Sequence, residues 1–244
     1  MATMAMSRSI SKRLVSSPST WSRRLYHSYD HAAPLGPFSN AQCRILAAAL
    51  GHVGKYGFTL TTLGLGANEA GYIDASTHLF PDAAFSLVHY HLYTQRLALA
   101  ACPPPPSADV ESRIRAYTWE RLRANHQVIG RWPEALALAA LPRNVPVALN
   151  ELSLLVDDIH FLAGDASVDT SWYTKRASLA TIYASTELFM TGDKSPDYKD
   201  TRDFLERRFK AMDSVGSSLS AIAEWGNFTA SAAINVLRSK GMRV

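Results

Sequence analysis

The residues best suited to chemistry in this 244-residue chain are histidines and carboxylates at helical spacing. Asp157 and His160 lie three positions apart, which places them on one face of a helix, where they could bind a metal ion. A di-iron bundle would need a second such pair and two further carboxylates on facing helices, and the sequence contains no Glu-x-x-His. His89 and His91 are two positions apart and point to different helix faces. We therefore expect no metal site and no cofactor.

Motifs of the common enzyme classes are also missing from the sequence. It contains no Gly-x-Ser-x-Gly nucleophile elbow, no phosphate-binding loop and no Gly-x-Gly-x-x-Gly fingerprint. Cys43 could act as a nucleophile in principle, but it lies in a segment that we expect to be a scaffold. The two cysteines, Cys43 and Cys102, are too few for a disulfide framework. We expect no catalytic residue.

The elements that position these side chains are predicted to be helices throughout. Hydrophobic residues make up 47% of the chain and charged residues 19%, which excludes a disordered protein. No run of 18 apolar residues exists, so we expect no membrane-spanning helix. From Asn40 onward the apolar residues recur at helical spacing, with no alternation typical of strands. Glycine and proline predict the helix boundaries. The first expected helix carries the apolar face Ile45, Leu46, Ala49, Leu50, Val53 and Tyr56 and stops at Gly57. The next ones run from Thr61 or Thr62 to about 70, and over about 74–80, 82–101 and 108–127. The last ones begin at Pro133, end at Gly164, cover about 171–191, begin at Ser195-Pro196-Asp197 and cover 217–239.

The N-terminal segment has the amino-acid composition of a targeting sequence. Residues 1–29 hold five of the 25 basic residues, eight serines and no acidic residue. Residues 30–244 carry 20 basic and 21 acidic residues, so the net charge of +4 comes from this segment. An Arg- and Ser-rich, acid-free N-terminus is typical of a mitochondrial transit peptide, which we assign to residues 1–30. The alternative is a basic tail that binds nucleic acid.

The next segment combines short helices with a glycine turn. The residues concerned are Arg44-Ile45-Leu46-Ala47-Ala48-Ala49-Leu50, Tyr56-Gly57-Phe58, Thr61-Thr62-Leu63, Ala70-Gly71-Tyr72 and His78-Leu79-Phe80-Pro81-Asp82. They resemble the helix-turn-helix of the tetracycline-repressor superfamily, and we assign residues 40–101 to such a subdomain. However, no Lys or Arg lies between Lys55 and Arg96, whereas reading DNA requires cations and base-reading side chains. A DNA-binding regulator is therefore only the alternative hypothesis, and we expect no nucleic-acid partner.

The second half of the chain carries a more specific set of motifs. They are Leu141-Pro142-Arg143-Asn144-Val145-Pro146, Val156-Asp157-Asp158, Trp172-Tyr173-Thr174-Lys175-Arg176, Ile182-Tyr183-Ala184-Ser185-Thr186-Glu187-Leu188 and Thr201-Arg202-Asp203-Phe204-Leu205-Glu206. In this order they resemble the mitochondrial coenzyme Q biosynthesis accessory proteins, lipid-binding proteins with a tetracycline-repressor-like fold. The likeness runs from about Arg44 to the C-terminus. Pro103–Pro106 depart from the longer charged linker usual at that place.

The resemblance implies a fold and a function. The fold would be all-α, with about ten helices, an N-terminal helix-turn-helix and a helical ligand-binding bundle over 107–215. The protein would not be an enzyme. It would bind an isoprenoid lipid or quinone and present it to the di-iron demethoxyubiquinone hydroxylase, on the matrix side of the mitochondrial inner membrane. Other coenzyme Q synthesis proteins would be further partners, and superfamily analogy implies a homodimer. The remaining alternative is a catalyst of a ring modification.

Three groups of residues are candidates for these roles. Apolar faces of two helices could line a lipid cavity or form an ordinary core: Leu152, Val156, Ile159, Leu179, Ile182, Tyr183 and Phe189. The amphipathic segment 216–244 could lie on a membrane or pack on protein: Leu219, Ile222, Trp225, Phe228, Ile234 and Leu237. The family resemblance implies that the hydroxylase contacts a group of aromatic and charged residues: Asp157, Asp158, Asp169, Trp172, Tyr173 and Arg176. Alternatively, Trp172 and Tyr173 could be the first residues of a helix that packs on the core.

Overall fold

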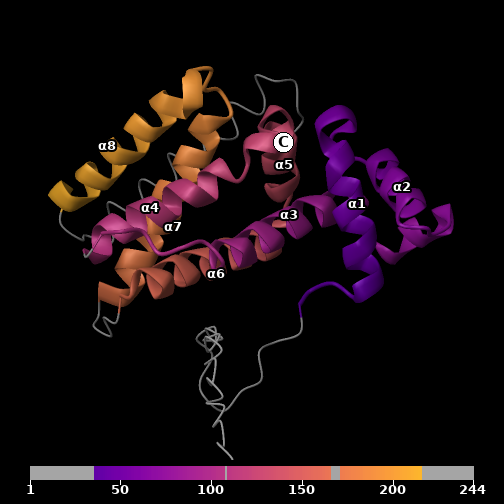
Figure 1. Cartoon of the computed structure of the whole chain (residues 1–244), viewed down its shortest axis with the longest axis horizontal. Coiled ribbons are helices and arrows are strands. Elements are labelled where there is room, and N and C mark those ends of the chain that lie inside the picture. Colours follow the sequence, from indigo (N-terminus) through magenta and orange to yellow (C-terminus); the bar gives the residue numbers. More distant parts are fainter. Residues whose placement is uncertain (1–35, 108, 166–170, 216–244) are drawn as a thin grey trace, which may run out of the picture. The chain divides into compact units, whose positions relative to one another are not determined.

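The fold is that of a computed structural model, which describes residues 36–107, 109–165 and 171–215. The chain divides into two units, Met1–Pro34 and Leu35–Val244, and all described residues lie in the second. Within the described ranges every regular element is helical and none is a strand, which confirms the all-α prediction (Figure 1). The expected transit peptide and the segment 216–244 with all six of its membrane-associating candidates lie outside the described residues. The elements are α1 (Asn40–Tyr56), α2 (Leu60–Glu69), η1 (Asp74–Leu79), α3 (Ala83–Leu99), α4 (Val110–Arg123), η2 (His126–Arg131), α5 (Trp132–Ala139), α6 (Val145–Ala163), α7 (Ser171–Met190), η3 (Pro196–Tyr198) and α8 (Lys199–Val215).

Glycine and proline end the helices where their conformational preferences predict. Gly57 follows α1 with φ of 70°, and Gly164 ends α6 in the left-handed conformation with φ of 78°. The four prolines 103–106 follow α3, and Pro133 lies in the first turn of α5. These boundaries depend on local backbone chemistry, so the sequence predicts them well.

Other boundaries differ from the prediction. Thr59, not Thr61 or Thr62, caps α2, because its side chain accepts a hydrogen bond from the Thr62 backbone N–H. The segment 74–79 is a 3-10 helix, and α4 ends at Arg123 before the separate turn η2. Short elements are fixed by tertiary packing, which periodicity does not report.

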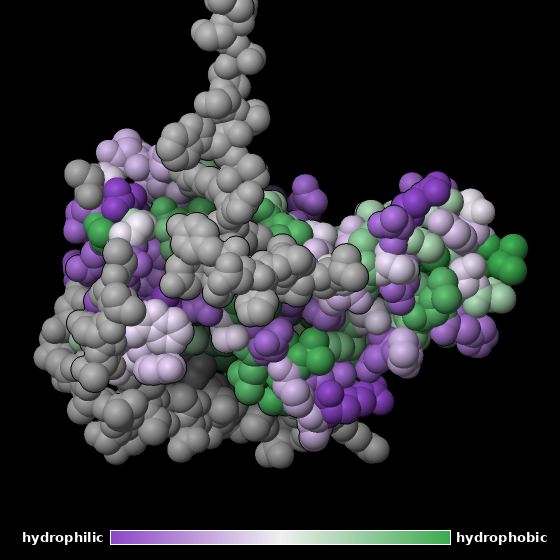
Figure 2. Space-filling view, turned by 90° about the horizontal axis from the view of Figure 1, so that it is seen from below, coloured by the Kyte–Doolittle hydropathy of each residue, from purple (hydrophilic) through white to green (hydrophobic). Residues whose placement is uncertain are grey.

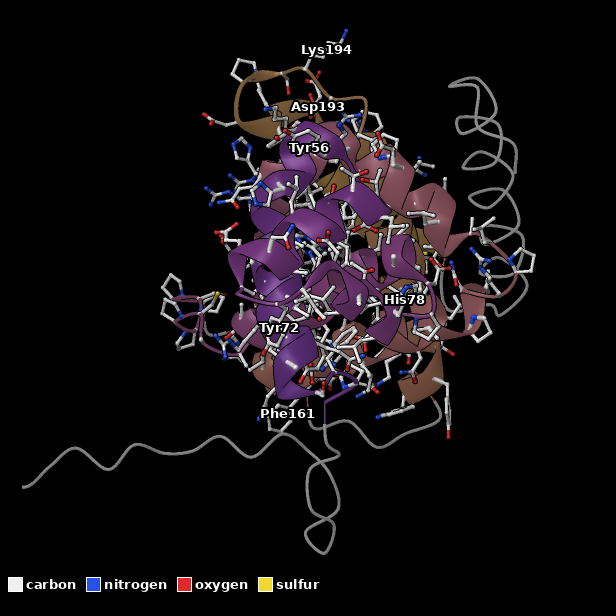
Figure 3. All side chains as sticks on the ribbon, turned by 90° about the vertical axis from the view of Figure 1, so that its right-hand side faces the viewer. Tyr56, Tyr72, His78, Phe161, Asp193 and Lys194 are labelled. Atoms are coloured by element: carbon white, nitrogen blue, oxygen red, sulfur yellow. The ribbon has the colours of Figure 1, made fainter. Side chains whose placement is uncertain are left out.

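The start of α8 is a second correction. A helix does open at Ser195-Pro196-Asp197, but it is the 3-10 turn η3, with Ser195 at its N-cap position. Asp197 and Tyr198 have φ of 53° and 56°, so the backbone turns there and α8 begins only at Lys199. Asp193 stabilises this turn, because its carboxylate accepts hydrogen bonds from the backbone N–H groups of Ser195 and Thr201. Figure 3 shows Asp193 and Lys194 in this connection, at the opposite end of the view from Phe161 of α6.

Two hydrophobic clusters hold the helices together. The first lies among α1, α2, α3, η2 and α5 and includes the buried Phe80, which follows η1. The second lies among α4, α6, α7 and α8. α3 runs from α1 along α6 and contributes to both clusters, so it connects the helices α1 and α2 to the bundle of α4, α6, α7 and α8 (Figure 1).

The surface near α2 carries exposed apolar side chains. Ile73 is 74% exposed and Leu60 is 60% exposed. Figure 2 shows hydrophobic residues among polar ones at the end that α1 and α2 form. Such a surface differs from the cationic face that DNA-binding heads present to phosphate groups.

Candidate functional site

An apolar pocket of about 630 Å³ lies among α4, α6, α7 and α8. Its volume falls within the range of ordinary ligand-binding sites. Leu179 and Ile182, two of the predicted lipid-binding residues, lie in its wall. Its other apolar side chains come from the flanking helices: Val110, Ile114, Phe209 and Met212.

The other predicted lipid-binding residues do not share this pocket. Leu152 and Tyr183 line a smaller cavity of about 140 Å³ bordered by α3, α5, α6 and α7. Val156 and Ile159 lie in the packed core and line neither cavity. Phe189 is 39% exposed, and its ring stacks on Phe204 of α8 with centroids 4.4 Å apart. The structure therefore separates these residues into two cavities, a core and a surface position.

His160 also lines the larger pocket, although the sequence suggested it only as a metal ligand. His160 is 3% exposed, and Nδ1 lies 3.0 Å from Oδ2 of Asp165. Within the described part of the chain, Nε2 has no hydrogen-bond partner. Burial is the main cause that lowers the pKa of His160, which favours the neutral ring.

A buried polar network that the sequence did not predict borders the smaller cavity. Asn125 accepts a hydrogen bond from Nη1 of Arg121 at 2.9 Å and donates one to Oε1 of Glu187 at 2.9 Å. The Tyr183 hydroxyl also donates to Glu187, at 3.1 Å. Burial raises the pKa of Glu187, and it lowers the pKa of His91, whose Nε2 lies 3.0 Å from Oδ1 of Asn125, to about 4.

Four of the predicted docking residues come together at the junction of α6 and α7. Nε of Arg176 lies 2.5 Å from Oδ1 of Asp157, and its guanidinium lies 3.7 Å from the centroid of the Trp172 ring. The Tyr173 ring packs edge-on against Trp172, with centroids 4.7 Å apart, and Tyr173 is 75% exposed. We call Asp157, Trp172, Tyr173 and Arg176 the aromatic patch. An exposed tyrosine that packs on a tryptophan held by an arginine has the composition of an interface anchor.

The two remaining docking candidates are not part of this patch. Asp158 points to α3, where its carboxylate lies 3.0 Å from Nη1 of Arg96. Arg96 also binds Glu151 of α6 at 3.1 Å, so Asp158 belongs to a half-buried ion-pair network that joins α3 to α6. Asp169 lies outside the described residues.

The polar residues considered for metal binding have other partners. Nε2 of His89 lies 3.4 Å from Oε1 of Glu151, whereas His91 contacts Asn125. Over the described ranges, no group of three His, Cys, Asp or Glu side chains could hold a metal ion. Cys43 and Cys102 are free thiols. The same residues include no helix that is long and apolar enough to cross a membrane.

Fold and pocket together define an all-helical protein with an apolar cavity in its C-terminal bundle. Residues 145–216 match the COQ9 family. The chain is 33% identical to the mitochondrial ubiquinone biosynthesis protein coq9 of Schizosaccharomyces pombe, over 98% of this chain and 94% of the relative. It is 38% identical to the mitochondrial ubiquinone biosynthesis protein COQ9-B of Xenopus laevis and 34% identical to the mitochondrial ubiquinone biosynthesis protein COQ9 of Homo sapiens. Each match covers 76% of this chain, with 67% and 61% of the respective relatives. The chain therefore belongs to the COQ9 family.

Proposed function

We propose that this chain is a lipid-binding accessory protein of ubiquinone synthesis without catalytic activity of its own. In this proposal it acts on the matrix side of the mitochondrial inner membrane as a peripheral homodimer. It binds an isoprenoid quinone intermediate and presents it to the demethoxyubiquinone hydroxylase. The names of the relatives, mitochondrial ubiquinone biosynthesis proteins, support the pathway and the compartment. Segment 1–30 would direct import, and segment 216–244 would attach the protein to the membrane.

The observation that carries the proposal is the 630 Å³ pocket. A prenylated ring is poorly soluble in water, so a carrier must cover its apolar surface. Leu179, Ile182 and Phe209 supply that surface in the pocket. A long polyprenyl tail exceeds the volume, so we infer that the pocket takes the ring or the nearest isoprene units, while the rest of the tail extends toward the membrane.

Filling the pocket tests this assignment. Ser178 lies in the pocket wall on α7, and Ser178→Trp would place an indole where the ligand lies. We expect the variant to lose most of the quinone or prenyl lipid that co-purifies with the wild-type chain, measured by extraction and mass spectrometry. The control is Ser153→Trp, the same change at an exposed position of α6 outside the pocket. Equal lipid content in the two variants would contradict the assignment.

The aromatic patch is the proposed contact with the hydroxylase. Tyr173→Ala removes its most exposed aromatic ring, so the fold should be little affected. We expect hydroxylase binding to weaken by about 2 kcal/mol, or roughly 30-fold, as measured by surface plasmon resonance. Tyr56→Ala, at an exposed tyrosine of α1, is the matched control and should leave binding unchanged. If Tyr173→Ala bound the hydroxylase as tightly as the wild-type chain does, the aromatic patch would not be the contact surface.

A further inference from the structure

The pocket among α4, α6, α7 and α8 opens at the surface of the described part of the chain. Val110 of α4, Ser178 of α7 and Met212 of α8 lie in its wall, and each of the three is only partly buried. A protein that carries an apolar ligand through water must shield that ligand from the solvent. The opening therefore needs a cover.

The chain leaves the described bundle at the edge of this pocket. Phe209 and Met212 of α8 form part of the pocket wall, and α8 ends at Val215, three residues after Met212. Segment 216–244, which lies outside the described residues, therefore starts beside the opening. So short a connection holds the start of the segment near the pocket at an effective concentration on the order of millimolar, so even a weak contact would be populated.

The sequence of the segment supplies an apolar face that is long enough to cross the opening. In a helix, Leu219, Ile222 and Ala223 share one face, which continues through Ala230, Ala233, Ile234 and Leu237. A sphere with the volume of the pocket is about 11 Å across, and two helical turns rise by about 11 Å. The eight residues 219–226 are therefore enough to span it.

We propose that the start of segment 216–244 docks on this pocket of its own chain, with Leu219 and Ile222 against the apolar wall, and so covers a bound lipid. The inference rests on the proposed function, because a cover serves a pocket that holds a lipid. The same apolar face cannot contact the pocket and a bilayer at once. Attachment of the segment to the membrane therefore uncovers the pocket, where lipid can be taken up or handed over.

Photocrosslinking of the full-length chain tests where the segment docks. The photoreactive residue p-benzoylphenylalanine would replace Val110, which reports from the α4 wall of the pocket. Irradiation in solution without vesicles should link position 110 to residues in 216–230 of the same chain, as located by peptide mass spectrometry. The control places the same residue at Arg123, at the other end of α4 and outside this pocket, where no such product should form.

Two further comparisons separate a specific contact from chance proximity. Ile222→Asp puts a charge on the apolar face and should lower the crosslink yield at position 110 several-fold, whereas Ala221→Asp, on the opposite side of a helix, should leave the yield unchanged. Vesicles of phosphatidylcholine and phosphatidylglycerol should also lower the yield several-fold. The basic residues Arg238, Lys240 and Arg243 draw the segment to such anionic lipid.

The outcomes distinguish this inference from the proposed function. If position 110 gives no product with the segment, links to a second copy of the chain, or gives an equal yield in Ile222→Asp, docking within the chain is refuted. Lipid extracted from the same samples reports on the pocket itself. If prenyl lipid is present without the crosslink, the inference fails while the lipid-binding function stands. If the crosslink forms in a chain that carries no lipid, the docked segment stands while the lipid-binding function fails.

Discussion

Replacing Arg121 with methionine should lower the free energy of unfolding by about 3 kcal/mol, because it leaves the buried Glu187 carboxylate without its nearby cation. Arg121 is 1% exposed and Glu187 is 7% exposed, and Asn125 bridges them. Methionine fills a similar volume, so the loss should come from electrostatics and not from a cavity. Urea unfolding followed by circular dichroism measures the effect.

The matched control is Arg123, two residues later on the same helix, α4. Arg123 is 59% exposed in an ion pair with Glu120, so Arg123→Met should change stability by less than about 0.5 kcal/mol. Burial raises the pKa of Glu187 in the folded state, and a raised pKa means that protonation favours folding. The deficit of Arg121→Met should therefore shrink as the pH falls from 8 toward 5. A deficit as small as that of Arg123→Met would show that the network contributes little.

Adding one methyl group at Gly66 should destabilise the fold by about 3 kcal/mol, at the upper end of the usual cost of overpacking. A Cβ atom there would lie 2.5 Å from the backbone nitrogen of Ala49 and 2.6 Å from its Cα atom. Backbone atoms of α1 cannot move aside as a flexible side chain would, so α1 and α2 must separate. Thermal unfolding monitored by circular dichroism would report the loss.

Gly64 offers the same substitution on the same helix without the contact. A Cβ atom at Gly64 meets nothing within 4 Å. Gly64→Ala should therefore gain roughly 0.5–1 kcal/mol, because alanine favours the helix more than glycine does. If Gly66→Ala and Gly64→Ala had equal free energies of unfolding, the close contact between α1 and α2 at Gly66 would not matter for stability.

The fold was largely predictable because its helix boundaries depend on local chemistry. Helices end at Gly57, at Gly164 and before the four prolines 103–106, because of the backbone preferences of glycine and proline. The start of α8 was not predictable in this way. The positive φ angles at Asp197 and Tyr198 depend on Asp193, whose carboxylate reaches Thr201 eight residues later.

The site was only partly predictable because sequence gives helix faces and not cavities. Leu179 and Phe189 both belong to apolar positions of α7, yet one lines a pocket and the other is exposed on the surface. Neighbouring residues can also diverge, as Asp157 contacts Arg176 of α7 while Asp158 contacts Arg96 of α3. Successive helical residues differ by about 100° in direction, and only the packed structure tells which partner each one meets.

The measurement that tests the central claim most directly is the lipid content of the purified full-length chain. The protein would be extracted with organic solvent, and the lipids identified and quantified by mass spectrometry against the protein concentration. We expect a stoichiometric amount of a prenylated quinone, hydroquinone or phenol, held in the pocket that Leu179 and Ile182 line. A stable, folded protein that carries no prenyl lipid would contradict it, and the chain would then be better understood as a docking scaffold that acts through the aromatic patch.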